Sequence, residues 1–180
     1  MDYKFKTEPY EHQLQALGAC HNKENFALFM EMGTGKSKVL IDNIAMLYDK
    51  GKINSALIVA PKGVYRNWER QEIPIHMPEH IKYQIITWSP ATTKKQAEEN
   101  RKLFIHDEDL VIFLMNIEAF STKKGLKIAE KFLLSHSTLM AIDESTTIKS
   151  PTASRTKTVL KLRTLAKYRR ILTGSPVTKS

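Results

Sequence analysis

The sequence predicts an α/β domain with a central, mostly parallel β-sheet that helices cover on both faces. Short apolar runs rich in Val, Ile and Leu recur along the chain, and polar stretches with helical periodicity separate them. The runs are nearly continuous rather than alternating, which is typical of strands buried on both faces of a parallel sheet. Charged or glycine-rich segments directly follow several runs, at the edge where such sheets bind their ligands.

The apolar runs give the expected strands, and the stretches between them give the expected helices. Strands are expected at 26–30, 55–60, 81–87, 110–115, 138–142 and 168–172. Helices are expected at 38–48, 64–72, 93–104, 127–135 and 151–167. The last helix has a clear start, because Ser150 can act as its N-cap and Pro151 suits the first helical position.

Length and composition favour one domain. The chain has 180 residues, of which 42% are hydrophobic, which is enough to bury the core of a single domain. The longest apolar run, Leu110 to Met115, is far shorter than the ~20 residues that span a bilayer, so no membrane segment is expected. The N-terminus lacks a secretory signal and Cys20 is the single cysteine, which favours an intracellular location in the cytoplasm, nucleoid or nucleus.

The formal charge of +9 at pH 7 is concentrated late in the sequence. Residues 145–180 contain nine Lys and Arg residues and no Asp or Glu, so the preceding 144 residues carry 19 basic and 19 acidic side chains. Such a segment is either a surface that faces a polyanion or a solvated helix face whose acidic partners lie elsewhere in the fold. Both interpretations remain open from the sequence alone.

A glycine-rich turn, Gly-Thr-Gly-Lys-Ser, follows the first expected strand and precedes the first expected helix. Gly33 and Gly35 allow backbone conformations in which consecutive N–H groups point at phosphate oxygens. Lys36 would bring a point charge to the β- and γ-phosphates of a nucleotide, and Ser37 would bring a hydroxyl to Mg²⁺. The full phosphate-loop pattern has glycine where this chain has Met30, so an ordinary strand-turn-helix is the competing interpretation.

Two carboxylates, Asp143 and Glu144, directly follow the strand expected at 138–142. Mg²⁺ bound to β- and γ-phosphates needs an acidic partner, which Asp143 can supply. Glu144 points to the other side of the chain and is the candidate general base that positions an attacking water. The competing interpretation is a pair of loop carboxylates at the start of a helix.

In their order along the chain, these motifs resemble the first RecA-like lobe of superfamily 2 helicases and translocases, closest to the Swi/Snf-like branch, a DEAD/DEAH-box-type ATP-binding domain. The resemblance runs from about Pro9 to the end of the sequence. In that family the early glycine of motif I is commonly absent, which accounts for Met30. The resemblance implies a three-layer P-loop NTPase fold in which residues 1–180 form one ATP-binding lobe, the N-terminal part of a larger two-lobe protein. ATP and Mg²⁺ are the implied cofactors.

The resemblance also implies roles for individual residues. Segment 8–13 is similar to the glutamine motif, so Gln13 would read the adenine, segment 31–37 is similar to motif I, and segment 143–146 is similar to the Asp-Glu-x-His box. The implied ATP contacts are Gln13, Met32, Gly33, Thr34, Gly35, Lys36, Ser37 and Lys38. The implied Mg²⁺ ligands are Ser37 and Asp143, and the implied catalytic residues are Glu144, Lys36 and Asp143.

Three further segments imply contacts with nucleic acid. Segment 57–69 is similar to motif Ia, whose loop touches the nucleic-acid backbone, and segment 116–120 lies where the family places another strand-contacting segment. Segment 172–176 is similar to motif III, which links hydrolysis to movement. The implied contact and coupling residues are Pro61, Lys62, Asn67, Trp68, Asn116, Thr173, Gly174 and Ser175. The two tryptophans could also be base-stacking platforms, although packing in the core is the favoured interpretation of Trp68 and Trp88.

The sequence departs from the family pattern in two respects. Thr146 stands where the Asp-Glu-x-His box has histidine, and threonine cannot carry a proton or bridge two groups as an imidazole does. No segment matches the later motifs, which include the arginine finger of a second lobe, and such a finger contributes on the order of a thousandfold or more to hydrolysis. This chain alone is therefore expected to bind ATP and to hydrolyse it very slowly.

The leading functional hypothesis is the ATP-binding lobe of a translocase on double-stranded DNA, which would contact the backbone rather than the bases and depend steeply on salt. An unwinding helicase of the same superfamily, acting on DNA or RNA, is the main alternative. A small-molecule kinase or GTPase is disfavoured because no guanine-reading Asn-Lys-x-Asp segment occurs. A non-enzymatic nucleic-acid-binding module is disfavoured by the intact phosphate-loop and carboxylate residues.

Overall fold

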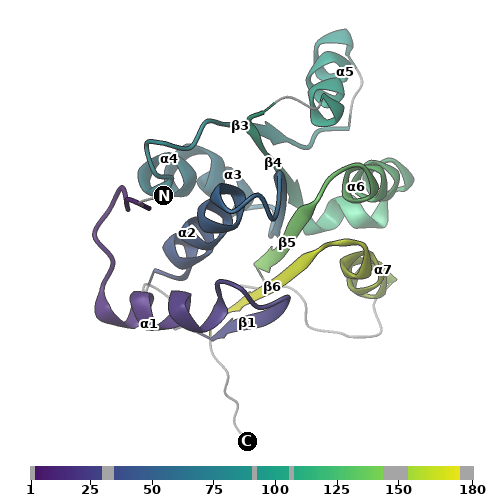
Figure 1. The fold of residues 1–180 in the computed structure, drawn as a ribbon. Coiled ribbons are helices and arrows are strands. Elements are labelled where there is room, and N and C mark those ends of the chain that lie inside the picture. The colour runs from purple at the N-terminus through teal and green to yellow at the C-terminus, as the bar shows by residue number, and fades with distance from the viewer. Residues whose placement is uncertain (1–2, 30–34, 91–92, 106–107, 144–153, 175–180) are drawn as a thin grey trace, which may run out of the picture.

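Six strands form one sheet in the computed structural model, which describes residues 3–29, 35–90, 93–105, 108–143 and 154–174. Each of these strands is parallel to its neighbours, and their order across the sheet is β1-β6-β5-β2-β4-β3 (Figure 1). The prediction of an α/β fold with a central, mostly parallel sheet is therefore confirmed.

Strands and helices alternate along most of the chain. The strands are β1 (Asn25–Phe29), β2 (Ser55–Ala60), β3 (Tyr83–Thr87), β4 (Leu110–Asn116), β5 (Thr138–Asp143) and β6 (Tyr168–Thr173). The α-helices are α1 (Glu11–Cys20), α2 (Lys36–Asp49), α3 (Tyr65–Asn67), α4 (Ile73–His76), α5 (Lys94–Arg101), α6 (Lys123–Ser135) and α7 (Ser154–Leu162). Shorter turns are the π-helical η1 (Trp68–Glu72) and the 3₁₀ segments η2 (Lys102–Phe104), η3 (Ile117–Ser121) and η4 (Arg163–Leu165).

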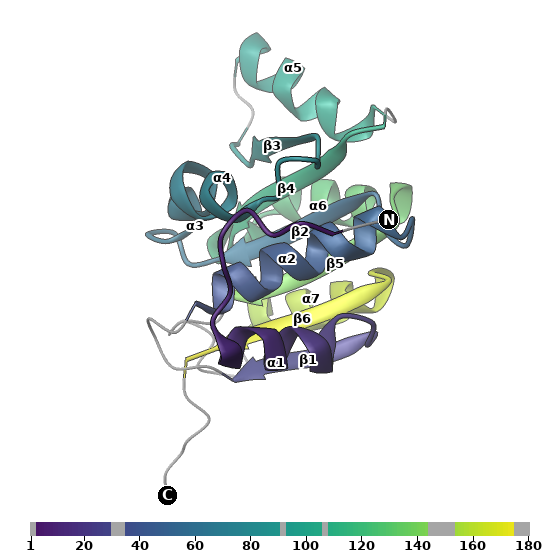
Figure 2. The ribbon, with the colours of Figure 1, turned by 60° about the vertical axis from the view of Figure 1, so that its left-hand side comes forward.

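The helices form a layer on each face of the sheet (Figures 1 and 2). Helices α1 to α4 lie on one face, α6 and α7 lie on the other, and α5 stands beyond the edge strand β3. Side chains of β2 alternate between two cores: Ala56 and Ile58 pack on the side of α1 and α2, whereas Leu57 and Val59 pack on the side of α6 and α7. Because β2 is buried on both faces, it needs the continuous apolar sequence that it has.

Two helices differ from the sequence-based prediction. Helix α6 begins about one turn earlier than expected, because the Thr122 hydroxyl accepts a hydrogen bond from the Gly125 N–H and caps the helix. Helix α1 was not expected, since its buried side is short and partly polar and consists of Gln13, Leu17 and Cys20. The expected start of α7 at Ser150 and Pro151 lies outside the described residues.

The helix expected at 64–72 contains a π-turn and continues to His76. The Ile73 N–H donates to the carbonyl of Trp68, five residues earlier. Pro74 follows and has no N–H with which to continue the ordinary helical pattern. Such turns are frequent at functional sites, and this one begins at the residue whose indole reaches the end of β5.

A buried polar cluster around Arg170 joins β6 to α1 and α2. The Arg170 side chain has no exposed surface, and its guanidinium donates to the Cys20 carbonyl at 2.8 Å, the Glu24 carbonyl at 3.4 Å and the Asn43 Oδ1 at 2.8 Å. Cys20 is the last residue of α1, so the guanidinium meets the negative end of that helix dipole. Burial lowers the pKa of Arg170 and raises the pKa of the Cys20 thiol.

This cluster corrects the interpretation of the basic segment 145–180. Arg170 is neither a polyanion-facing nor a solvated side chain, because it lies inside the domain. Arg169 is half-buried, and its Nε donates to the Asn25 Oδ1 at 2.5 Å. Within the described part of the segment, the exposed basic side chains are Lys157, Lys161 and Lys167.

No helix in the described part of the chain has the length and apolar character needed to cross a membrane. In the same residues, no group of three or more His, Cys, Asp and Glu side chains is arranged to hold a metal ion. Cys20 is a free, buried thiol that lies 3.8 Å from Asn43 Oδ1, so its role in the structure is packing.

Arg170→Lys tests whether the guanidinium is needed inside the domain. Lysine keeps the charge but concentrates it at one point, so it cannot serve all of the carbonyl and amide oxygens that surround Arg170. We expect a loss of about 2–4 kcal/mol in the free energy of unfolding, measured by urea denaturation. Lys167→Arg, at an exposed position, is the control and should change stability by less than about 0.5 kcal/mol. An equally small effect of Arg170→Lys would contradict the assigned role.

Candidate active site

Most of the predicted site residues that the structure describes lie at or near one edge of the sheet. Parallel strands bring their carboxyl ends to the same edge. Asp143, Asn116 and Thr173 are the last residues of β5, β4 and β6. Gly35 lies between β1 and α2, and Lys62 follows β2. Given the strand order, residues after β1, β6 and β5 form one half of this edge, and residues after β2, β4 and β3 form the other half.

The N-terminus of α2 is suited to an anion. Gly35 is its N-cap and has a φ of +83°, a left-handed conformation that disfavours any residue with a Cβ. Lys36 and Ser37 begin the helix with half-buried side chains, and no acidic residue occurs in its first turn. The first backbone N–H groups of a helix have no partner within it and form the positive end of its dipole. This turn can therefore bind a phosphate group.

Gln13 of α1 contacts this turn directly. Its Nε2 donates to the Gly35 carbonyl at 3.2 Å, and its Oε1 accepts from the Tyr10 N–H at 2.8 Å. The Gln13 side chain is buried, and a Cβ added to Gly35 would lie only 2.0 Å from Gln13 Nε2. The structure thus brings Gln13 and the predicted phosphate-binding turn together, and their close approach requires glycine at position 35.

Lys38 directs its side chain away from this turn. Its ammonium forms an ion pair with Asp42, with 2.8 Å between Nζ and Oδ2, and both side chains are almost completely buried. The Tyr3 hydroxyl donates to the same carboxylate, and burial raises the pKa of Tyr3 and so keeps this donor protonated. The Phe5 ring lies 5.0 Å from the ammonium. Of the groups of Lys38, the backbone N–H is therefore the one that can contact a phosphate.

A buried hydrogen bond joins Asp143 to the helical segment after β2. The indole Nε1–H of Trp68 donates to Asp143 Oδ2 at 3.3 Å, and the two residues are 1% and 6% exposed. The bond holds the carboxylate at the end of β5. The burial of Trp68 favours the core-packing interpretation, because the ring would have to leave the core to stack on a base or to touch nucleic acid.

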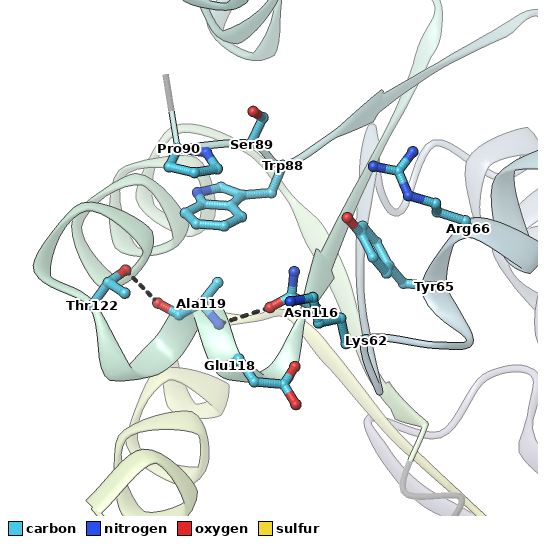
Figure 3. A pocket seen from close by; sticks show the side chains of 10 residues that line it. All are labelled: Lys62, Tyr65, Arg66, Trp88, Ser89, Pro90, Asn116, Glu118, Ala119 and Thr122. Atoms are coloured by element: carbon cyan, nitrogen blue, oxygen red, sulfur yellow. Dashed lines mark hydrogen bonds between the residues drawn. The ribbon is translucent and has the colours of Figure 1, made fainter. Parts of the chain in front are cut away.

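A pocket of about 310 Å³ opens on the β2 and β4 half of the edge (Figure 3). Its wall includes the exposed Lys62 and Arg66 on one side and the half-buried Trp88 on the other. Asn116 lies between them and is held in place because its Oδ1 accepts from the Ala119 N–H at 2.9 Å. Exposed cationic side chains beside a fixed amide are the groups that proteins use to contact nucleic-acid phosphates.

Glu118 gives the same pocket one carboxylate. Its Oε1 is buried and has no hydrogen-bond partner among the described residues. The pocket therefore combines two cationic side chains with one acceptor, and it is not uniformly basic.

The remaining predicted contact residues occupy different environments. Pro61 is buried, and its carbonyl accepts from the N–H groups that follow it at the start of α3. Asn67 is exposed, and its Nδ2 donates to Glu72 at 3.4 Å. Thr173 and Gly174 are half-buried at the end of β6. Of these four residues, Asn67 therefore presents the most accessible side chain.

Five predicted site residues lie outside the described part of the chain, namely Met32, Gly33, Thr34, Glu144 and Ser175. The same holds for Thr146, which replaces the box histidine. Their roles stay predictions from the motifs.

Two features of this edge differ from the sequence-based expectations. Trp88, for which core packing is the favoured interpretation from sequence, is half-buried and lines the pocket wall. It directly follows β3, a position at which parallel strands present ligand-contacting residues. The hydrogen bond between Trp68 and Asp143 cannot be predicted from the sequence, because the two residues are 75 positions apart and belong to different motifs.

The family model described as the SNF2-related domain matches residues 11–180. No curated protein matches the chain.

Three solved structures share the fold. The Sulfolobus solfataricus SWI2/SNF2 ATPase core in complex with dsDNA has a TM-score of 0.70 at 22% identity, over 98% of this chain and 34% of that chain. The UvsW helicase from bacteriophage T4 has a TM-score of 0.64 at 14% identity, over 94% and 53% of the two chains. A nuclease-deletion mutant of the Type ISP restriction-modification enzyme LlaGI, in complex with a DNA substrate mimic, has a TM-score of 0.63 at 13% identity, over 96% and 18%. The present chain thus spans about half or less of each of these proteins.

Gly35→Ala tests the close approach of Gln13 to the phosphate-binding turn. The left-handed backbone and the contact with Gln13 Nε2 should together lower the free energy of unfolding by about 1–2 kcal/mol in urea denaturation. Gly63→Ala is the matched control, since a Cβ there meets no atom within 4 Å. If the contact matters, Gly35→Ala should cost less free energy of unfolding in a chain that also carries Gln13→Ala than in the wild-type chain. Strictly additive losses in the double variant would contradict the contact.

Trp68→Phe tests the role of the indole N–H. The variant keeps an aromatic ring in the core and removes the donor to Asp143, so we expect the Mg²⁺ concentration needed for binding of a fluorescent ATP analogue to rise about tenfold. Trp88→Phe is the control and should leave this Mg²⁺ dependence unchanged. A loss of stability in Trp68→Phe without any change in Mg²⁺ dependence would show that the bond only supports packing.

Proposed function

The chain belongs to the family of SNF2-related domains, and from this premise we propose that it is the ATP-binding lobe of a nucleic-acid-dependent ATPase that moves on double-stranded DNA. Membership confirms the resemblance of its motifs to the first RecA-like lobe of the Swi/Snf-like branch. In this lobe, ATP binds at the half of the sheet edge formed by β1, β6 and β5, and DNA binds at the half formed by β2, β4 and β3.

The hydrogen bond between Trp68 and Asp143 carries the proposal. Asp143 is the carboxylate expected to act on ATP and Mg²⁺, whereas Trp68 belongs to the segment expected to follow nucleic acid. A kinase or GTPase needs no direct link between a carboxylate at the phosphate site and a second, cationic pocket. A protein that couples hydrolysis to movement needs one, and the buried hydrogen bond of 3.3 Å between Trp68 Nε1 and Asp143 Oδ2 can supply it.

ATP binds with its phosphates over the first turn of α2. The backbone N–H groups of that turn and the ammonium of Lys36 stabilise the phosphate charge. The buried ion pair between Lys38 and Asp42 stabilises the same helix. Gln13 contributes the adenine-reading side chain. Its hydrogen bond to Gly35 couples recognition of the base to the conformation of the turn.

The residues at this half of the edge suit Mg²⁺. Ser37 in the first turn of α2 and Asp143 at the end of β5 supply oxygen ligands, which Mg²⁺ prefers. When bound, Mg²⁺ neutralises charge on the β- and γ-phosphates. Trp68 orients the Asp143 carboxylate for this role, and Glu144 accepts the proton of the attacking water.

Duplex DNA lies across the β2 and β4 half of the edge, against Lys62 and Asn116. The contacts are to phosphate and sugar, which position the protein without reading sequence. Two of the similar structures were solved with DNA or a DNA mimic, which supports DNA as the partner. Thr173 is the last residue of β6 and Gly174 follows it. Because β6 lies between β1, which precedes the phosphate-binding turn, and β5, which ends at Asp143, these two residues are placed to couple hydrolysis to movement.

Full activity requires a second RecA-like lobe, which closes on this one and supplies an arginine finger. The present chain corresponds to 34% of the S. solfataricus core, as expected for one lobe of a larger protein. By itself, the lobe binds ATP and hydrolyses it very slowly.

Lys36→Ala tests the ATP site. At a hundredfold excess over its Kd, ATP with Mg²⁺ should stabilise the wild-type chain by about 2.7 kcal/mol, seen as a rise in melting temperature. Lys36→Ala should lose most of this rise, because no other described side chain of the first turn of α2 carries a charge toward the phosphates. Lys50→Ala, at the exposed far end of the same helix, is the control. An undiminished rise in Lys36→Ala would contradict the assignment.

The ATPase of a protein that contains both lobes separates the competing functions. Stimulation by duplex DNA and not by single strands supports a translocase on double-stranded DNA. Stimulation by single strands or by RNA would support an unwinding helicase instead. Hydrolysis that ignores every nucleic acid would overturn the proposal in favour of an unrelated P-loop enzyme.

A further inference from the structure

A second hollow of about 470 Å³ lies beside the Lys62 pocket, between the end of β3, η2 and α6. Three lysines of α6, Lys124, Lys127 and Lys131, form one wall, and Trp88 and Phe104 contribute aromatic surface to the others. We call this hollow the lysine groove. The proposed translocase mechanism assigns it no role.

The lysine groove is cationic and lacks a neutralising carboxylate. All three lysines are exposed, and no acidic residue lines the groove. The acidic residues on the neighbouring α5 are already paired, Glu98 with Arg101 and Glu99 with Lys102. The acidic residue of α6, Glu130, lines a different hollow, between α6 and α7. The positive charge of this face is therefore available to an external anion.

The spacing of the lysines suits a linear polyanion. Lys124, Lys127 and Lys131 recur at intervals of three and four residues, so they share one face of α6. At a rise of 1.5 Å per residue they extend over roughly 10 Å, the axial length of about three phosphates in one DNA strand. The Lys131 ammonium lies 4.2 Å from the centre of the Phe104 ring, which holds this end of the row in place.

The lysine groove adjoins the pocket assigned to DNA. Trp88 and Ser89 line both hollows. Figure 3 shows the indole of Trp88 on the same side of the pocket as Thr122, the cap of α6. A chain of phosphates that leaves Lys62 and Asn116 and passes Trp88 would therefore arrive at the row of lysines.

We propose that the lysine groove binds the sugar-phosphate backbone of the DNA segment that continues beyond the Lys62 pocket. The inference rests on the proposed function and extends it, because it lengthens the DNA footprint of this lobe from the carboxyl edge of the sheet to the outer face of α6. Binding there is electrostatic and independent of base sequence.

The test compares two double variants that remove the same charge. Lys127→Ala with Lys131→Ala empties the groove of two ammonium groups, whereas Lys50→Ala with Lys52→Ala removes two exposed lysines near the amino ends of the strands. Duplex affinity is measured by fluorescence anisotropy at several salt concentrations, with a short and a long duplex. ATP binding by thermal shift serves as the check that each variant is folded.

With the long duplex, the groove variant should lose about 1.8 from the slope of log K against log salt, since each lost phosphate contact removes about 0.9. With a short duplex that ends at the Lys62 pocket, the groove variant and the control should bind equally. The control should keep the wild-type slope with both duplexes.

Three results would overturn the inference, and they differ in what else they contradict. If the wild-type chain binds duplex with a steep salt dependence and the groove variant equals the control, only the groove assignment fails. If the wild-type chain shows no salt-dependent binding to duplex, the proposed function fails together with the groove. Binding of polyglutamate that depends on Lys127 and Lys131, with no change in duplex affinity, would assign the groove to an acidic protein segment instead.

Discussion

The parallel direction of all described strands is the constraint on which the rest of the structure depends. It brings every strand's carboxyl end to one edge, so segments that are distant in sequence become neighbours there. Trp68 and Asp143, 75 positions apart, share a hydrogen bond for this reason. The strand order then divides the edge, with the phosphate-binding turn and Asp143 on one half and the Lys62 pocket on the other. The hydrogen bond from the Trp68 indole to Asp143 links the two halves, in addition to the pairing of β2 with β5.

A parallel sheet that is buried on both faces leaves little water for polar groups, so each polar side chain inside needs protein partners. Arg170 finds them in backbone carbonyls at the end of α1, and Lys38 finds one in Asp42. Tyr3 completes the second cluster from the N-terminal segment. Both clusters include residues of α2, the helix whose first turn is the proposed phosphate site. Buried polar groups outside that turn therefore hold the helix in place.

The sequence predicts the features that depend on local pattern. The strands β2 and β4 are recognisable because burial on both faces demands uninterrupted apolar residues, and Gly35 and Asp143 are recognisable because each directly follows or precedes a regular element. Helix α1 escapes prediction, since one of its few inward residues is the polar Gln13. The inward turn of Lys38 and the burial of Arg170 escape it as well. Lys38 and Asp42 are four residues apart, a spacing that suggests an ion pair but not its burial. The partners of Arg170 are two backbone carbonyls and an amide oxygen from segments distant in sequence.

The central claim is that one edge of the sheet binds ATP with Mg²⁺, and that the hydrogen bond between Trp68 and Asp143 couples the nucleotide site to the nucleic-acid site. A crystal structure of the chain with Mg²⁺ and a non-hydrolysable ATP analogue tests it most directly. The account predicts phosphates over the first turn of α2, Mg²⁺ between Ser37 and Asp143, and the indole N–H of Trp68 still bonded to Asp143. A nucleotide bound elsewhere, or a metal site that excludes Asp143, would contradict it.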